Sequence, residues 1–200
     1  MKFILAEKLN MSQIFSSSGT VVPVTILKAS QNVVTQVKTP EKDKYSAVQI
    51  GFGKKRKTTK ALSGHTKQLG VFKGFSEFRV DDSSAYKRGQ KIGVDIFVIG
   101  DKVKVTAEMK GRGFAGPVKR HGFHGAPASH GHDHPRAVGS IGQRFPQHVR
   151  KGLRMAGHMA GVRTVTNLEV VDVDVKKNLI AIKGAVPGAP GGIVKIQSMK

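Results

Sequence analysis

The stretch from Lys110 to Arg163 is the feature that most constrains the fold, because it cannot form a core of its own. It reads KGRGFAGPVKRHGFHGAPASHGHDHPRAVGSIGQRFPQHVRKGLRMAGHMAGVR, with ten Lys or Arg, eleven Gly and a single acidic residue, Asp133. Aliphatic side chains are sparse, so burial of apolar surface cannot offset the entropy lost on ordering the chain. We therefore expect this stretch to become ordered against something large and negatively charged.

The sequence on both sides of this stretch predicts a mainly β fold. Short β-branched or alternating segments recur between turn signals, at Thr20–Ala29, Gln31–Lys38, Tyr45–Phe52, Phe75–Val80, Lys91–Ile99, Lys102–Met109, Asn167–Val175, Leu179–Lys183 and Gly192–Gln197. Such spacing favours a small closed or nearly closed β-barrel. We expect the first two segments to form an antiparallel pair, Gly100-Asp101 to be a hairpin-like turn, and Thr59–Leu69 to be a short helix.

These expectations give one discontinuous domain and one insertion. Residues 1–109 and 164–200 are predicted to form the barrel, and residues 110–163 a long irregular loop inserted between two of its strands. The amino-terminal sequence MKFILAEKLN has four consecutive apolar residues before Glu7, fewer than a signal peptide needs.

The charge of the chain points to a polyanionic partner. Thirty-four Lys and Arg against thirteen Asp and Glu give a net charge of +21, which nucleic acid would neutralise. A membrane surface fits less well, because the basic stretch is interrupted by Gly and Pro and is not an amphipathic helix. Cysteine is absent, which excludes disulfides and thiolate metal sites. We expect a cytoplasmic protein without a membrane partner.

Two basic regions are the candidate RNA-binding sites. The run from Gly53 to Lys60 reads as a solvated loop or as a phosphate-binding segment. In the long stretch, Gly residues would let the backbone approach sugar and phosphate, and Phe114, Phe123 and Phe145 would stack on unpaired bases or form a small local core. The predicted RNA-binding residues are Lys54, Lys55, Arg56, Lys57, Lys60, Lys110, Arg112, Lys119, Arg120, His121, His130, Arg136, Arg144, Arg150, Lys151, Arg154, His158 and Arg163.

Metal binding and catalysis are the alternatives to RNA binding. His130, His132 and His134 alternate, and in an extended chain they would face one side and could capture nickel or zinc. One nearby carboxylate and no cysteine leave the ligand set incomplete, so we favour RNA contact by these residues. The sequence has no G-x-S-x-G motif and no recognisable carboxylate pair. GRGFAG has the letters of a dinucleotide-binding loop, but we expect no strand-to-helix unit after it. We predict no enzyme, no cofactor and no native metal site.

Five ordered motifs resemble the bacterial type of the large-subunit ribosomal protein L3 family. They are KGRGFAGPVKRHGF, SHG, GSIGQ, RMAGHM and IKGAVPGAPGG (Ile182–Gly192), and the amino-terminal MSQIFSSSGTVVPVTIL also resembles the opening of that family. The resemblance covers residues 3 to 196, and five motifs in one order are far more specific than any one of them.

The resemblance implies a small barrel of the translation-protein type with a loop that threads through ribosomal RNA toward the peptidyl transferase centre. It also implies binding to 23S-type RNA early in assembly, contact with neighbouring large-subunit proteins, and no chemistry of its own. Gln143 stands at the Gln of GSIGQ, which a glutamine methyltransferase modifies in many bacteria. Gln147 stands where the family commonly has Gly, which bears on that modification. The competing interpretations are a free-standing nucleic-acid chaperone or chromatin-like protein, and a metal hydrolase using the three alternating His residues.

Overall fold

The protein consists of two compact units in a computed structural model that describes residues 1–30, 32–67 and 69–199. The first unit, here called the body, comprises Met1–Glu108 and Val162–Lys200, and the second, the arm, is Met109–Gly161. The fold is mainly β, as the sequence predicts.

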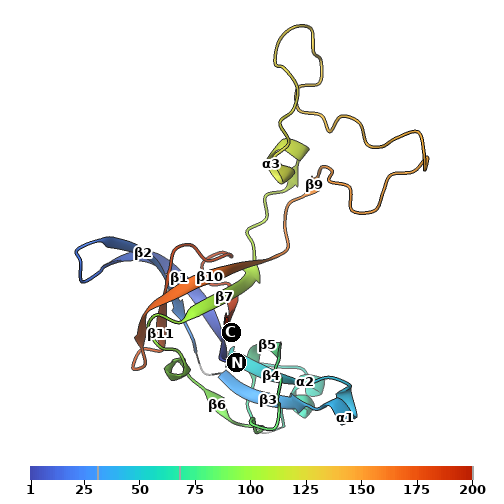
Figure 1. Cartoon of the computed structure of the whole chain (residues 1–200). Helices are drawn as coiled ribbons and strands as arrows, with labels where there is room; N and C mark the ends of the chain where they lie inside the picture. Colours follow the sequence, from blue (N-terminus) through green and yellow to red (C-terminus); the bar gives the residue numbers. More distant parts are fainter. Residues whose placement is uncertain (31, 68, 200) are drawn as a thin grey trace. The chain divides into compact units, whose positions relative to one another are not determined.

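Six antiparallel strands of the body pair edge to edge in a ring (Figure 1). In ring order they are β1 (Phe3–Phe15), β12 (Ile193–Ser198), β7 (Lys102–Glu108), β10 (Val162–Asp174), β11 (Leu179–Lys183) and β2 (Val21–Lys28). The ring closes at β1, which pairs with β12 from Phe3 to Glu7 and with β2 from Glu7 to Phe15. Each strand therefore has a partner on both edges over part of its length.

A second sheet of the body has the strand order β5-β4-β3-β6. Its strands are β3 (Asn32–Lys38), β4 (Ala47–Lys54), β5 (Phe72–Arg79) and β6 (Lys91–Ile92). The short helix α1 (Pro40–Asp43) joins β3 to β4, α2 (Lys60–Thr66) joins β4 to β5, and a 3-10 turn, η1 (Val94–Ile96), follows β6. Thr59 begins α2 by accepting a hydrogen bond from the amide of Leu62 on its side-chain oxygen.

Strand β1 contributes to both hydrophobic cores of the body. Its Ile4 and Ala6 belong to the ring core, whose other buried members are Leu27, Ala29, Val94, Phe97, Val103, Val105, Ala107, Val170, Ile180, Ile182, Val186, Val194 and Ile196. Phe3 and Leu5 point to the opposite face, into the core of the second sheet with Val34, Val48, Ile50, Phe52, Phe78, Val80 and Ile92. Because alternate residues of a strand face opposite sides, one strand fills both cores.

Buried polar side chains fasten the neighbouring segments. Asn32 is fully buried, and its amide donates to the carbonyl of Leu5 (2.9 Å) and accepts from the amide N–H of Leu5 (3.1 Å). Lys8 Nζ donates to the carbonyls of Val186 (2.6 Å) and Gly188 (3.1 Å). These bonds satisfy backbone groups that would otherwise be buried without partners, and the bonds of Lys8 hold part of the segment with the sequence IKGAVPGAPGG.

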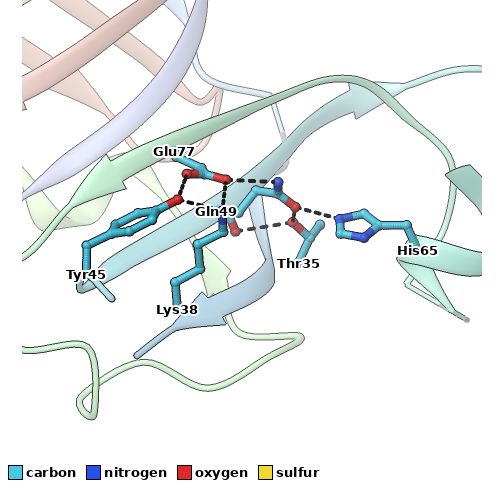
Figure 2. A network of polar contacts seen from close by, with 6 residues as sticks. All are labelled: Thr35, Lys38, Tyr45, Gln49, His65 and Glu77. Carbon is cyan, nitrogen blue, oxygen red and sulfur yellow. Dashed lines mark hydrogen bonds and ion pairs between the residues drawn. The ribbon is translucent and has the colours of Figure 1, made fainter. Parts of the chain in front are cut away.

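A polar network connects β3, β4, β5 and α2 on the surface of the second sheet (Figure 2). Glu77 accepts hydrogen bonds from Lys38 Nζ (2.8 Å) and from the hydroxyl of Tyr45 (3.0 Å). On the other side of the network, Gln49 Oε1 lies 2.7 Å from Nε2 of His65, which is on α2. The network therefore attaches α2, and the basic run before it, to the sheet.

Several sequence expectations were wrong in detail. Strands β2 and β3 do not pair, because β2 belongs to the ring and β3 to the second sheet. The expected strand Lys91–Ile99 is only the two residues of β6 followed by η1, so Gly100-Asp101 is not a hairpin turn between paired strands. Strand β1 was not predicted. Gln31 and Gln68, which fall in an expected strand and helix, lie outside the described residues.

Candidate nucleic-acid interface

The base of the arm is a short pair of strands followed by a helix. Strand β8 (Phe114–Ala115) pairs with β9 (Gly157–His158), and the amide of Met159 donates to the carbonyl of Gly113 at 2.9 Å. Helix α3 (Pro117–His121) begins with Pro, and Gly122, at a φ of 72°, ends it. The sequence predicted no strand-to-helix unit after GRGFAG. Strand β8 lies within this motif and α3 follows it, but elements of two and five residues make no dinucleotide-binding unit.

Two side chains of helix α3 bond to the backbone carbonyl of Met155, which lies on the segment that leads back to β9. Arg120 Nη1 donates to the carbonyl oxygen of Met155 at 2.9 Å, and His121 Nε2 lies 3.0 Å from the same oxygen. A side chain at Gly157 would place its Cβ 2.6 Å from Arg120 Nη1, so the absence of a side chain there makes room for the guanidinium group. Arg120 and His121 were predicted as RNA-binding residues, but here both are half-buried and support the arm.

Beyond α3 the arm makes one loop and then a longer excursion before it returns to β9 (Figure 1). The first loop is closed where the amide of Ala126 donates to the carbonyl of Pro135 at 2.9 Å. Gly125 has a φ of 77°, and a Cβ there would collide with that same carbonyl oxygen. Glycine is therefore required by both the backbone conformation and the close approach.

A hollow of about 820 Å³ lies between this loop and the end of α3. Its lining includes four imidazoles, those of His121, His124, His132 and His134, together with Phe123 and the cation Arg154. No carboxylate lines it, since Asp133, the single acidic residue of the arm, is outside the lining.

The charged side chains of the arm are exposed and almost all of one sign. The arm holds nine Lys or Arg residues, seven of the eight His residues and one of the thirteen acidic residues. Among the described residues, the ion pairs found all lie in the body. The exposed predicted residues of the arm are Lys110, Arg112, Lys119, His130, Arg136, Arg144, Arg150, Lys151, Arg154 and His158.

The remaining predicted residues lie in the body. Lys54 ends β4, Lys55, Arg56 and Lys57 form the loop after it, and Lys60 begins α2; all five are exposed. Arg163 is exposed on β10, where it pairs in register with Ala107. Exposed predicted cations therefore lie in both units.

Two of the three phenylalanines expected to stack on bases are available for stacking. Phe114 is 70% exposed and Phe145 is 68% exposed, so neither is part of a local core. Phe114 contacts His158 edge to face, and the guanidinium of Arg144 lies 5.8 Å from the ring centre of Phe145. Phe123 is half-buried beside His121.

Gln143 is exposed on the longer excursion of the arm. Four residues further on, Gln147 has a φ of 61°, in the left-handed region that glycine occupies without strain. The backbone therefore explains why glycine suits position 147, and why glutamine there is a departure with a conformational cost.

Neither a metal cluster nor a membrane-spanning helix was found in the described part of the chain. No group of three His, Cys, Asp or Glu residues there is arranged to hold a metal ion, the alternating His130, His132 and His134 included. No helix in residues 1–30, 32–67 or 69–199 is long and apolar enough to cross a bilayer.

Comparison with known proteins identifies close relatives over the whole length. The family model described as ribosomal protein L3 matches residues 77–177. A large ribosomal subunit protein uL3 from Pelotomaculum thermopropionicum is 48% identical over 98% of this chain and 96% of its own. Proteins of the same name from Herpetosiphon aurantiacus (50% identical; 96% of this chain, 94% of the relative) and Thermotoga maritima (48%; 100% and 98%) are equally similar.

Proposed function

This chain belongs to the ribosomal protein L3 family, and from that premise we propose that it is a structural constituent of the large ribosomal subunit. Relatives that bear this name match 98% and 100% of its length. The proposed role is to bind and order RNA, not to catalyse a reaction. As a constituent of a bacterial-type ribosome it would act in the cytoplasm.

We propose that the arm and the basic run Lys54–Lys60 bind 23S-type ribosomal RNA. The observation that carries this proposal is the exposure of the arm cations, which have no ion-pair partner among the described residues. Phosphates would supply the missing charge, and displacement of their counterions would favour binding. Gly residues and the exposed rings of Phe114 and Phe145 suit contact with unpaired nucleotides.

The finer architecture that we propose is that of the family. The ring of six strands would be a β-barrel of the translation-protein type, and residues 110–163 a loop that extends toward the peptidyl transferase centre. The body would contact neighbouring large-subunit proteins, and binding would occur early in subunit assembly. The closure of the ring at Glu7, which pairs with both Ile193 and Lys28, supports a barrel.

We also propose Gln143 as a substrate of a glutamine methyltransferase, which would be a transient partner. Its side chain is exposed, as such an enzyme requires. Mass spectrometry of the peptide from ribosomes should find a methyl group on Gln143 itself. If Gln147 hinders recognition through its backbone conformation, Gln147→Gly should raise the methylated fraction. An unmodified Gln143 in both proteins would contradict the proposal.

The proposed function is tested by sedimentation of the tagged protein from a cell lysate at moderate salt. We expect it in the large-subunit peak, with 23S-type RNA recovered after affinity capture. Purified protein should also bind that RNA with an affinity that falls steeply with salt. Recovery with the small subunit, or as free protein only, would reject the proposal.

A further inference from the structure

The hollow of the arm has the properties of a binding site for a small planar group. Its volume of about 820 Å³ falls within the range of small-ligand sites. It is built by three segments: the end of α3 with residues 122–126, residues 132–139, and Arg154 from the returning chain. The bond from Ala126 to the Pro135 carbonyl holds the first two segments together.

The side chains that line the hollow retain free binding groups. His121 uses Nε2 toward Met155, and His132 Nδ1 accepts from the amide of His134 at 3.3 Å. The imidazoles of His124 and His134 and the guanidinium of Arg154 have no hydrogen-bond partner among the described residues. Ring faces, ring nitrogens and one cation are thus available in one place.

We propose that this hollow receives one unpaired nucleotide of the RNA, with its base against the imidazole and Phe123 rings and its phosphate near Arg154. The inference rests on the proposed function and adds a specific site to it. Aromatic and imidazole rings stack on extruded bases, and imidazole nitrogens can bond their edges. A simple phosphate track would need cations spaced along a surface, whereas the lining of the hollow has five rings and one cation. A metal ion would need a carboxylate or a closer cluster than the described residues provide.

The test compares two variants that remove the same chemistry from the arm. His124→Ala removes an imidazole that lines the hollow, and His148→Ala removes an exposed imidazole that neither lines it nor belongs to the predicted RNA-binding residues. Each protein is bound to 23S-type RNA, and the reactivity of unpaired bases toward chemical probes is measured.

We expect a base protected by the wild type and by the control to become reactive with the hollow variant, and affinity to fall about tenfold. Equal protection patterns for the two variants would overturn the site. If the wild type itself protected no part of the RNA, the proposed function would fail first, so the two failures are distinguishable.

A second pair of variants covers the case in which the histidine changes open the loop. Loss of hydrogen-exchange protection at the Ala126 amide would report such opening. Arg154→Gln, inside the hollow, is then compared with Lys176→Gln, an exposed cation of the body that is not among the predicted RNA-binding residues. We expect only Arg154→Gln to expose the protected base. An equal effect of both variants would mean that Arg154 acts only through general attraction between cations and RNA, which would overturn the proposed site.

Discussion

At the scale of single residues, the charge of Glu77 is stabilised by its neighbours on the second sheet (Figure 2). The hydrogen bond from Lys38 is the main cause that lowers the pKa of Glu77 below its ordinary value of 4.5, and the Tyr45 hydroxyl lowers it further. The same bond raises the pKa of Lys38 above 10.5. Both groups are therefore charged across the neutral range, and the pair holds β3 to β5.

Replacing Glu77 with Gln should lower the free energy of unfolding at neutral pH. It should also remove part of the decrease of that free energy at acidic pH. A carboxyl whose folded pKa is lowered contributes stability above its unfolded pKa, near 4.5, and loses that contribution as pH falls through the folded value. The urea midpoints of wild type and Glu77→Gln should therefore differ at pH 7 and converge below pH 4.5. A constant difference between the two midpoints across this pH range would show that the charge of Glu77 does not contribute to stability.

Replacing Ser76 with Ala should not lower the free energy of unfolding, although the residue is buried, with 8% of its surface exposed. Its hydroxyl is buried and has no hydrogen-bond partner among the described residues, so Ser76→Ala removes an unsatisfied group and should raise the free energy of unfolding by about 1 kcal/mol. Thr25→Val is the matched change, because the Thr25 hydroxyl donates to the carbonyl of Gly184 at 2.7 Å. That variant should lose about 1 kcal/mol in the same urea titration. A similar decrease in the free energy of unfolding for both variants would contradict the conclusion that the Ser76 hydroxyl is unsatisfied.

At the scale of elements, the sequence predicts strands better than their partners. The segments Asn167–Val175 and Leu179–Lys183 were found as strands where expected: β10 ends at Asp174, one residue before the predicted end, and β11 has the predicted bounds. Strand β1 was missed because Phe3, Ile4, Leu5 and Ala6 are all buried, two in each core, so the usual alternation is absent. Strand β3 begins at Asn32, whose side chain bonds to Leu5 of β1, a contact across 27 positions that no local pattern reveals.

The arm shows the same limit. Its excess of cations and the proposal that it binds RNA follow from composition, but the contacts that support it from within do not. Gly122 after a Pro-initiated basic segment was a readable helix end. In contrast, the shared Met155 carbonyl and the approach of Gly125 to Pro135 join residues that are neighbours only in space. The hollow was missed for this reason.

Gly125→Ala should open the first loop of the arm, and Gly131→Ala should not. Both positions have positive φ, so alanine costs about 1 kcal/mol at each. Only at Gly125 would the added methyl group also strike the Pro135 carbonyl, whereas at Gly131 it meets open space. Hydrogen exchange at Ala126 should therefore accelerate in Gly125→Ala alone. Equal acceleration in both variants would attribute the effect to backbone strain and not to the contact.

At the scale of the whole molecule, the arm differs from the body in lacking acidic residues, not in density of cations. The arm has nine of the thirty-four Lys and Arg residues in 53 of the 200 positions, but only one of the thirteen acidic residues. The body retains a large basic excess, including the run Lys54–Lys60. Binding of RNA should therefore be divided between the units, and removal of the arm should weaken it without abolishing it.

The pairing at the two ends of the arm provides a clean way to remove it. Glu108 and Val162 are direct partners in β7 and β10, so replacing Met109–Gly161 with Asn-Gly should close a tight hairpin in the body. We expect a folded body by circular dichroism, because both cores lie outside the arm. Its affinity for 23S-type RNA should be weaker, and the slope of log K against log salt shallower by at most about 8. An unfolded product would show that the body depends on the arm, and an unchanged slope would show that the arm cations do not contact phosphate.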